Sequence, residues 1–343
     1  MKPFSVFRIA PVVLALTSLS CSDVVTDPPL RAEGTFTVNA STGWVYVSLA
    51  DSATVVPTPS ARESDAWDIA FFSTNVTLNG GQAGPGEVVG ACLCQNAGAT
   101  DAQILAMTED SEEAEFTAVT TVPAAATFVA EQLTAAISGW YAGAGASATA
   151  NADNVFLVRL ADGASFAKVR VTAIEAASAT SAGRVTLQYA VQPNATAAFG
   201  ATKTIVLDGT ASGGSAASVD LNADAFSTAA ADWDVRLVGW NLLVNGGVSG
   251  PGSAAAATGS GTFESITTAS TAPQAYRTDV YAGVFGQSRW YKYNLAGDNR
   301  ISPTFDVYLV KRGSTVYKLQ ITNYYSATGA PRHITFKYEQ IAP

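Results

Sequence analysis

A short segment near the C-terminus combines aromatic and cationic side chains in a pattern that suits ligand binding. The residues concerned are, in chain order, Arg289, Trp290, Tyr291, Lys292, Tyr293 and Arg300. Aromatic rings stack on flat molecules, and Lys and Arg pair with anions. The segment therefore predicts a site for a flat anionic ligand such as a porphyrin. The alternative is that alternate rings only pack a strand, and the spacing alone does not decide between the two.

Cys92 and Cys94 form a second candidate site, because only Leu93 separates them. Two thiols at this spacing could form a small disulfide ring, bind a soft metal or ligate iron. No His or further Cys is near in sequence, so a zinc site is weakly indicated and the identity of any metal stays unknown. We expect a local, redox-labile disulfide.

The remaining polar motifs indicate no catalytic machinery. The acidic run from Glu109 to Glu115 lacks the spaced Asp, Asn and Gly of a calcium loop, so we expect a solvated charge run. With His333 as the only histidine, no Ser-His-Asp set is available. The chain is therefore not expected to be an enzyme.

The N-terminus has the layout of an export signal. Residues 1–20 carry Lys2 and Arg8, then an apolar run, then small residues before Cys21. A cysteine at this place resembles the bacterial lipobox, in which the thiol is acylated; plain cleavage beside an incidental cysteine is the alternative. We expect lipidation at Cys21, a linker over residues 21–35 and a location at the outer membrane or cell surface.

The charge balance argues against a nucleic-acid partner. The chain has a formal net charge of −9, whereas phosphate binding needs a basic surface. Residues 22–200 carry 6 basic and 18 acidic side chains, and residues 201–343 carry 11 and 10. An anionic ligand should therefore prefer the second half of the chain.

A repeat at long period dominates the sequence. Trp67-Asp68 returns 166 residues later as Trp233-Asp234. At the same offset the chain repeats an Asn-Gly-Gly turn, from Asn79 and from Asn245, and each is followed by Gly-Pro-Gly. No helix or Lys-Ser/Thr pair follows these glycines, so they predict tight turns and no phosphate loop.

Three alternating segments end each copy of the repeat. They are residues 155–159, 168–172 and 184–189 in the first copy and 307–311, 318–322 and 333–338 in the second. Alternation of apolar and polar residues predicts strands with one buried face. In the last strand Ile334, Phe336 and Tyr338 should face inward, and Lys337 should face water.

The fold class predicted from these segments is all-β, with two tandem antiparallel domains. The first domain should span residues 36–193 and the second residues 200–343. The first copy contains an insertion, and its segment from Pro123 to Ile137 has the spacing of a short amphipathic helix.

At these residues the chain resembles the HmuY-like family of haem-binding lipoproteins. The resemblance rests on the Trp67-Asp68-Ile69-Ala70-Phe71 strand with its Asn-Gly-Gly turn, on Trp290-Tyr291-Lys292-Tyr293, on Tyr317 to Tyr325 and on Ile334 to Tyr338. It implies an all-β outer-membrane lipoprotein that binds haem without catalysis, and an outer-membrane transporter as a partner.

The iron ligands depart from the family pattern. Its well-known members use paired His or Met residues, yet this chain after Cys21 contains only His333 and Met107. His333 should be an exposed residue at a strand start, and Arg300 occupies a place where relatives carry His. We expect weak haem binding in the second copy without a bis-His pair. The rival interpretation is a structural or interaction lipoprotein that has lost haem binding.

Overall fold

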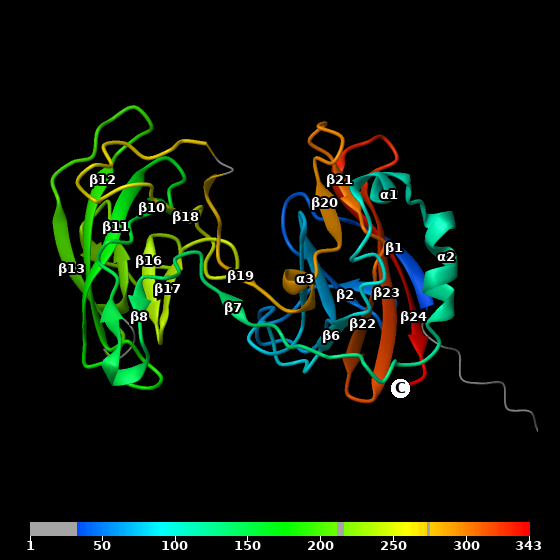
Figure 1. Ribbon diagram of the computed structural model, residues 1–343. Helices are drawn as coiled ribbons and strands as arrows, with labels where there is room; N and C mark the ends of the chain where they lie inside the picture. The colour runs from blue at the N-terminus through cyan, green and yellow to red at the C-terminus, as the bar shows by residue number, and fades with distance from the viewer. Residues whose placement is uncertain (1–32, 211–215, 273–274) are drawn as a thin grey trace, which may run out of the picture. The chain divides into compact units, whose positions relative to one another are not determined.

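The computed structural model describes residues 33–210, 216–272 and 275–343, which are mostly antiparallel strands with a few short helices (Figure 1). The predicted signal peptide, Cys21 and nearly all of the 21–35 linker lie outside these described residues. Within the described part of the chain, no helix is long and apolar enough to cross a membrane.

A five-stranded sheet pairs strands from both ends of the chain. Its order is β1 (Glu33–Asn39), β24 (Pro331–Ile341), β23 (Thr315–Tyr325), β22 (Val307–Arg312) and β6 (Val89–Cys92). A four-stranded sheet packs on it, in the order β3 (Ala53–Val55), β2 (Val45–Ser48), β4 (Ile69–Phe72) and β5 (Asn75–Leu78). The buried residues Val47, Phe71, Leu319 and Phe336 belong to one core cluster between them. We call this unit the terminal body.

The middle of the chain builds a second unit, the central body, with the same kind of sheet. Its five strands run in the order β13 (Lys203–Asp208), β12 (Arg184–Gln192), β11 (Phe166–Glu175), β10 (Phe156–Arg159) and β18 (Ala255–Thr258). A four-stranded sheet in the order β15 (Ala225–Phe226), β14 (Ser218–Asp220), β16 (Val235–Val238) and β17 (Asn241–Val244) packs on it. Shorter elements are β8 (Tyr141–Ala142), a 3₁₀ turn at Gly145–Ser147 and β9 (Thr149–Ala150). A separate hydrophobic cluster fills this body.

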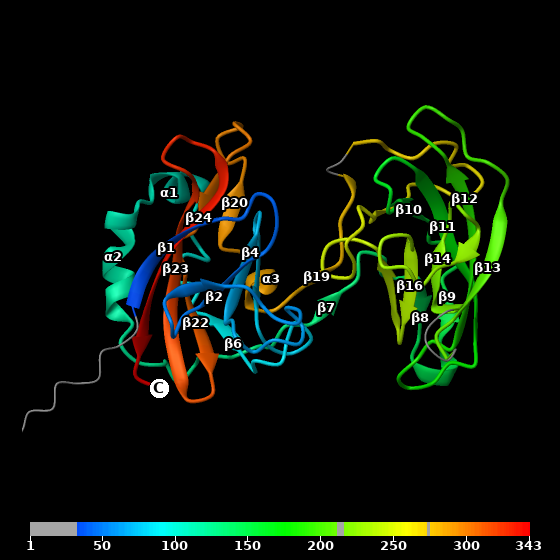
Figure 2. The same ribbon diagram turned by 180° about the vertical axis from the view of Figure 1, so that it is seen from behind.

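The alternation in β24 predicts its inner face correctly, since Ile334, Phe336 and Tyr338 are all buried. The expectation for Lys337 is wrong, because this side chain is only 7% exposed. Helix α2 (Glu109–Ala118) covers the outer face of the sheet, and its Glu113 carboxylate accepts a hydrogen bond from Lys337 Nζ. Figures 1 and 2 both show α1 and α2 on one side of this sheet and β2 on the other.

The predicted helix at residues 123–137 is absent, and two helices lie just before it. They are α1 (Asp101–Ala106) and α2, each opened by a capping box, at Thr100 with Gln103 and at Thr108 with Ser111. The 123–137 segment is extended instead. Backbone bonds between Val129 and Gly90 hold it along β6, so that Phe128, Val129 and Leu133 are partly buried and Ile137 is buried without a helix.

The Trp-Asp pairs of the repeat are structural anchors. Asp68 accepts bonds from Leu49 N (2.7 Å) and from Arg312 Nη1 (3.1 Å). Asp234 accepts bonds from Leu221 N (2.8 Å) and Ala161 N (2.7 Å). In both bodies the carboxylate therefore ties the end of a strand to the hairpin turn of the terminal meander.

The Asn-Gly-Gly segments form the tight turns that the sequence predicts. Asn79 Oδ1 accepts a bond from Gly86 N (3.2 Å), and Asn245 Oδ1 accepts one from Gly252 N (3.0 Å). A Cβ on Gly84 would lie 2.0 Å from Asn79 Oδ1, and one on Gly250 would lie 2.0 Å from Asn245 Oδ1. These glycines are needed because the Asn side chain fills the turn.

The strand pairing groups residues differently from the predicted 36–193 and 200–343 domains. β12 and β13 are neighbours in one sheet although the predicted join lies between them, and β6 of the first copy pairs with β22 of the second. One core cluster joins residues 38–88 to residues 284–338, and another lies within residues 137–256. Each five-stranded sheet therefore contains strands of both copies, whereas each four-stranded sheet belongs to one copy.

Two crossing segments connect the strands of the two bodies. β7 (Leu133–Thr134) pairs with β19 (Val280–Tyr281), and a buried acid precedes each of them. Glu131 Oε1 accepts a bond from Leu78 N (3.0 Å), and Asp279 accepts bonds from Ala136 N and Val244 N. Burial raises the pKa of Glu131 to about 7. The two acids therefore hold this ribbon to the edges of β5 and β17.

Candidate ligand site

The predicted aromatic and cationic segment forms a hairpin. β20 (Tyr291–Tyr293) pairs with β21 (Ile301–Pro303), so that Tyr293 lies opposite Ile301. Trp290 is 1% exposed and belongs to the core of the terminal body, with its Nε1 donating to Thr74 O (3.0 Å). It anchors the base of the hairpin and is not available to a ligand.

The outer part of the hairpin presents an accessible aromatic and cationic surface. Tyr293 is 58% exposed, and its hydroxyl donates to Asn299 Oδ1 (2.8 Å). The Arg300 guanidinium lies 4.4 Å from the ring centroid of Tyr325, whose hydroxyl accepts a bond from Ile301 N (2.8 Å). The stacked cation and ring form a flat platform, and the exposed Tyr293 ring lies on the facing strand of the hairpin.

The cations of this surface are free to meet an anion. Arg289, Lys292 and Arg300 are all exposed, and none of them has an ion-pair partner among the described residues. Asp298 is the nearest acid in sequence, and its Oδ1 accepts a bond from Arg300 N (3.1 Å). The hairpin therefore has a local excess of positive charge in an acidic protein. We call Tyr293, Arg300 and Tyr325, with Lys292, the hairpin platform.

Axial ligands for iron are scarce around this platform. Residues 289–303 and 323–330 contain no His, Met or Cys, so only tyrosine hydroxyls are at hand. His333 lies in β24, where its Nδ1 is 3.0 Å from Pro331 O and its register partner is Asn39. Met107 ends α1. The residues fit the plane and the acidic groups of a porphyrin, and they do not fit paired His or Met ligation.

Cys92 and Cys94 are joined in a disulfide, with their Cα atoms 5.1 Å apart. The bond closes a turn at the end of β6, and the neighbouring Gln95 accepts a bond from Val307 N (3.1 Å) at its Oε1. Both sulfur atoms are therefore occupied in this structure. Among the described residues no group of three or more His, Cys, Asp or Glu side chains is placed to hold a metal ion.

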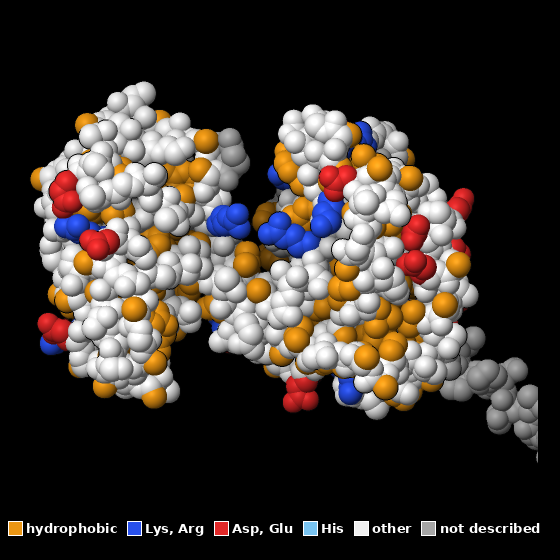
Figure 3. Space-filling view, viewed as in Figure 1, with side chains coloured by type: hydrophobic (Ala, Val, Ile, Leu, Met, Phe, Trp, Pro, Cys, Tyr) orange, Lys and Arg blue, Asp and Glu red, His pale blue; other side chains and the backbone are white. Residues whose placement is uncertain are grey.

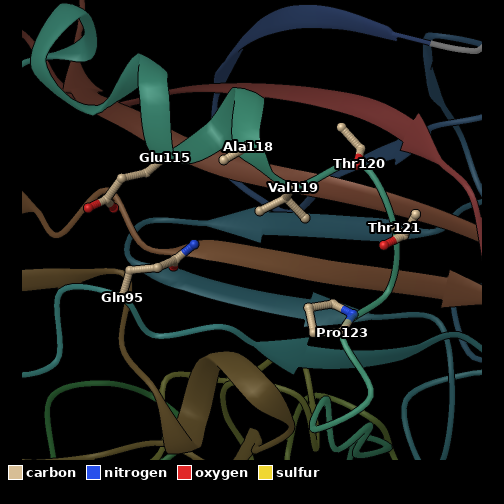
Figure 4. Close-up of a pocket in the computed structure, with 7 residues that line it drawn as sticks. All are labelled: Gln95, Glu115, Ala118, Val119, Thr120, Thr121 and Pro123. Atoms are coloured by element: carbon tan, nitrogen blue, oxygen red, sulfur yellow. The ribbon is translucent and has the colours of Figure 1, made fainter.

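A cavity of about 440 Å³ lies between the end of α2 and the loop after β6 (Figure 4). It is lined by Gln95, Glu115, Ala118, Val119, Thr120, Thr121 and Pro123. Burial, and then the nearby Glu112, raise the pKa of Glu115. Acidic side chains also gather over α2 (Figure 3), where Glu109, Asp110 and Glu113 are exposed or half-buried. This cavity would repel an anion, which leaves the hairpin platform as the better candidate.

Residues 40–189 match the HmuY protein family. The matched span runs from the segment before β2 to β12 and so includes strands of both bodies. No curated protein matches the chain.

Three solved structures are similar over 92% of this chain. A proposed lipoprotein from Bacteroides fragilis is 12% identical over 92% of its own chain, with a TM-score of 0.34. A proposed HmuY-like haem-binding protein from Bacteroides vulgatus is 12% identical over 94% of its chain, with a TM-score of 0.35. The ligand-free HmuY analogue of Tannerella forsythia is 11% identical over 98% of its chain, with a TM-score of 0.36.

Sequence reasoning missed Tyr325, the partner of Arg300. Its signal is the Tyr324-Tyr325 pair at the end of β23, which the alternation of that strand assigns to packing. The ring reaches Arg300 only because β21 lies beside the end of β23, as the bond from Ile301 N to the Tyr325 hydroxyl shows. That proximity is tertiary, and no spacing in the sequence encodes it.

Proposed function

We propose that this chain is an exported lipoprotein of the HmuY family that binds haem, or a related flat anionic ligand, on the hairpin platform. The observation that carries the proposal is the Arg300 guanidinium stacked on Tyr325, on a hairpin that also exposes the ring of Tyr293. Stacking would hold the ligand plane, and Arg300 and Lys292 would pair with its carboxylates. The protein acts as a binder and carries out no catalysis.

The proposed binding mode makes the metal dispensable. Because the platform has no His or Met, the ligand plane and its carboxylates supply the affinity. Protoporphyrin IX without iron should therefore quench the protein's tryptophan fluorescence with a Kd within about threefold of that of haemin. Tyr293→Ala and Arg300→Ala should weaken both ligands by about tenfold each. Haemin binding without any protoporphyrin binding would refute this mode.

The proposed location follows from the N-terminus. Acylation of Cys21 would tether the protein to the outer membrane or cell surface through the linker of residues 21–35. A bound ligand would then be presented to an outer-membrane transporter. The acidic net charge of −9 gives the protein no electrostatic attraction to nucleic acid.

We also propose that the chain consists of two divergent copies of one all-β domain, residues 36–193 and 200–343, with exchanged halves. The support is that Asp68 and Asp234, and likewise Asn79 and Asn245, make equivalent hydrogen bonds. The two five-stranded sheets also have equivalent strand orders. In each body the first half of one copy would pair with the second half of the other.

The rival function is a structural or interaction lipoprotein that keeps the fold without haem binding. It is favoured by the scarcity of axial ligands near the platform. The two functions differ in one readout, because only the binder responds to protoporphyrin IX through Arg300.

A further inference from the structure

A second cavity lies next to β2 and the segment that leads into β4, and the turn after β17 also lines it. Its volume is about 180 Å³, and its walls include Trp44, Tyr46, Trp67, Thr77 and Tyr281, with Arg62 also lining it. Gly247 and Val248 complete one side, and Val248 N donates to Asp279 O (3.1 Å), which lies just before β19, the strand of Tyr281. None of these residues belongs to the hairpin platform.

We propose that this cavity binds a small aromatic carboxylate with a single ring. An apolar cavity of roughly 150 Å³ is enough to hold benzene, so a volume of about 180 Å³ admits one ring with a carboxyl group. A porphyrin is several times larger and does not fit. The site is therefore distinct in size and in place from the one proposed for haem.

The aromatic side chains of the cavity wall are held in place by contacts within the protein. Trp67 is 1% exposed and is oriented by the bond from its Nε1 to Ala61 O (3.0 Å). The Tyr46 ring packs edge-on against it, with centroids 5.1 Å apart. Because β2 pairs with β4, the register places Tyr46 opposite Ala70. The aromatic faces are thus fixed by the sheet before any ligand arrives.

Several polar groups of the cavity have no partner in the protein. Among the described residues the hydroxyls of Tyr46 and Tyr281 make no hydrogen bond. Thr77 is 5% exposed, and its Oγ1 also lacks a partner. The buried Thr77 hydroxyl costs free energy while it is unpaired, and the hydroxyls of the half-buried Tyr46 and Tyr281 are open to pair with a ligand that enters the cavity.

Arg62 supplies the charge that selects an anion. It is exposed, it has no ion pair among the described residues, and it acts on Tyr281, where burial raises the pKa and Arg62 opposes the rise. The neighbouring Glu131 would oppose an anion. Burial raises its pKa to about 7, so that near neutral pH about half of it is uncharged. Arg62, which stays charged, therefore decides the sign of the ligand.

The repeat offers an internal comparison. At the offset of 166 residues, Trp233 corresponds to Trp67 and Arg236 to Ala70. The Arg236 guanidinium lies 4.1 Å from the Trp233 ring centroid, and its Nε donates to Ser218 Oγ (2.7 Å). In the central body the Arg236 guanidinium therefore covers the Trp233 ring. In the terminal body the equivalent residue is Ala70, which cannot cover Trp67, so this ring contacts Tyr46 and lines the cavity.

The test is isothermal titration calorimetry of the full mature chain with benzoate, 4-hydroxybenzoate and cyclohexanecarboxylate. Both aromatic acids should bind, with cyclohexanecarboxylate at least about tenfold weaker because it cannot stack. Arg62→Ala should weaken benzoate by about tenfold or more. Ala61→Leu, which fills the cavity without changing charge, should abolish binding. Absence of heat with both aromatic acids, or equal affinity of wild type and Arg62→Ala, would overturn the proposal.

Matched variants separate this site from the hairpin platform. Arg300→Ala should leave benzoate affinity unchanged, and Arg62→Ala should leave protoporphyrin affinity unchanged. If Arg300→Ala weakens benzoate as much as Arg62→Ala does, the acid binds at the platform and the cavity proposal fails. Failure of the wild-type protein to bind protoporphyrin IX would refute the haem proposal and leave the cavity proposal standing.

Discussion

At the scale of single residues, buried acids hold the molecule together. Asp68, Asp234, Glu131 and Asp279 each accept backbone or guanidinium hydrogen bonds from segments distant in sequence. Burial raises the pKa of Asp234 to about 6 and that of Glu131 to about 7. All four side chains are structural, and Asp234 and Glu131 also make stability depend on pH near neutrality.

Glu131→Gln should remove part of that pH dependence. The folded-state pKa of about 7 exceeds the ordinary value of 4.5, so the folded state keeps a proton that the unfolded state releases. The associated stabilisation is complete below pH 4.5 and is lost as pH rises through 7, about 3 kcal/mol in all. Urea unfolding at pH 5 and pH 8 should show that the wild type loses more stability than Glu131→Gln. The exposed Glu33→Gln should behave as wild type; an equal loss in Glu131→Gln would contradict the assignment.

Cys21→Ala tests the anchor, which lies outside the described residues. Without acyl chains the acidic protein has no affinity for lipid. The variant should move from the detergent phase to the aqueous phase in detergent partitioning of expressing cells. A variant that still sediments with membranes would show that Cys21 is not the lipidation site.

The spacing of residues in the sequence predicts some of these single-residue roles and misses others. The Trp-Asp and Asn-Gly-Gly anchors are visible in the sequence because both motifs recur at the same offset of 166 residues. The role of Trp290 is not, because a Trp in an alternating strand looks the same whether it faces a ligand or the core. The Tyr325 contact depends on strands that meet only in the folded chain.

At the scale of elements, α2 covers the outer face of the five-stranded sheet in the terminal body, so that side chains on this face are buried as well. Lys318 is 1% exposed and is held by Glu339 Oε2 (2.7 Å), by Phe116 O (3.1 Å) and by the Phe116 ring. In the central body Lys168 Nζ donates similarly to Phe263 O and Ile266 O. The same strand position therefore carries a buried lysine in both sheets, and different segments cover it.

Glu339→Gln should lower the free energy of unfolding by about 2 kcal/mol. The change leaves the buried Lys318 ammonium without its counter-charge, although Glu339 is one-third exposed, which reduces the effect. Glu175→Gln is the matched control, because its pair with Arg184 is exposed on both sides, and it should change stability by less than about 1 kcal/mol. Chemical denaturation of both variants measures the difference; equal effects would mean that α2 does not bury the lysine.

Period-two alternation locates the meander strands of both bodies to within a few residues, since each strand has one buried face. The helices were predictable in principle from their capping boxes at Thr100 and Thr108. The apolar spacing from Pro123 to Ile137 instead predicts a helix where the structure has none. It arises because that segment passes from one hydrophobic cluster to the next: Phe128 and Val129 pack against the clusters of the terminal body, and Ile137 belongs to that of the central body.

At the scale of the whole molecule, the cores do not follow the order of the repeat. The central body is continuous in sequence, whereas the terminal body combines both ends of the chain. Alternation identifies a strand but not its partner, so pairings such as β6 with β22 could not be predicted. The repeat in the sequence therefore suggests where one copy ends and the next begins. It does not predict which residues share a hydrophobic core.

Two fragments of the chain test this organisation. Residues 135–280 should show one cooperative thermal transition, because they contain both sheets and the core of the central body. Residues 200–343 should show none, because β13 lacks β12 and β22 lacks β6. Circular dichroism on heating distinguishes them. A cooperative transition of 200–343 alone would show that the second copy folds by itself and would contradict this organisation.

The most direct measurement of the central claim is a visible absorbance titration of the mature protein with haemin. The hairpin platform predicts weak binding with a spectrum that is not of the bis-His type, weakened by Arg300→Ala and unchanged by His333→Ala. A sharp six-coordinate, low-spin spectrum that His333→Ala abolishes would contradict it, and so would the absence of any spectral change.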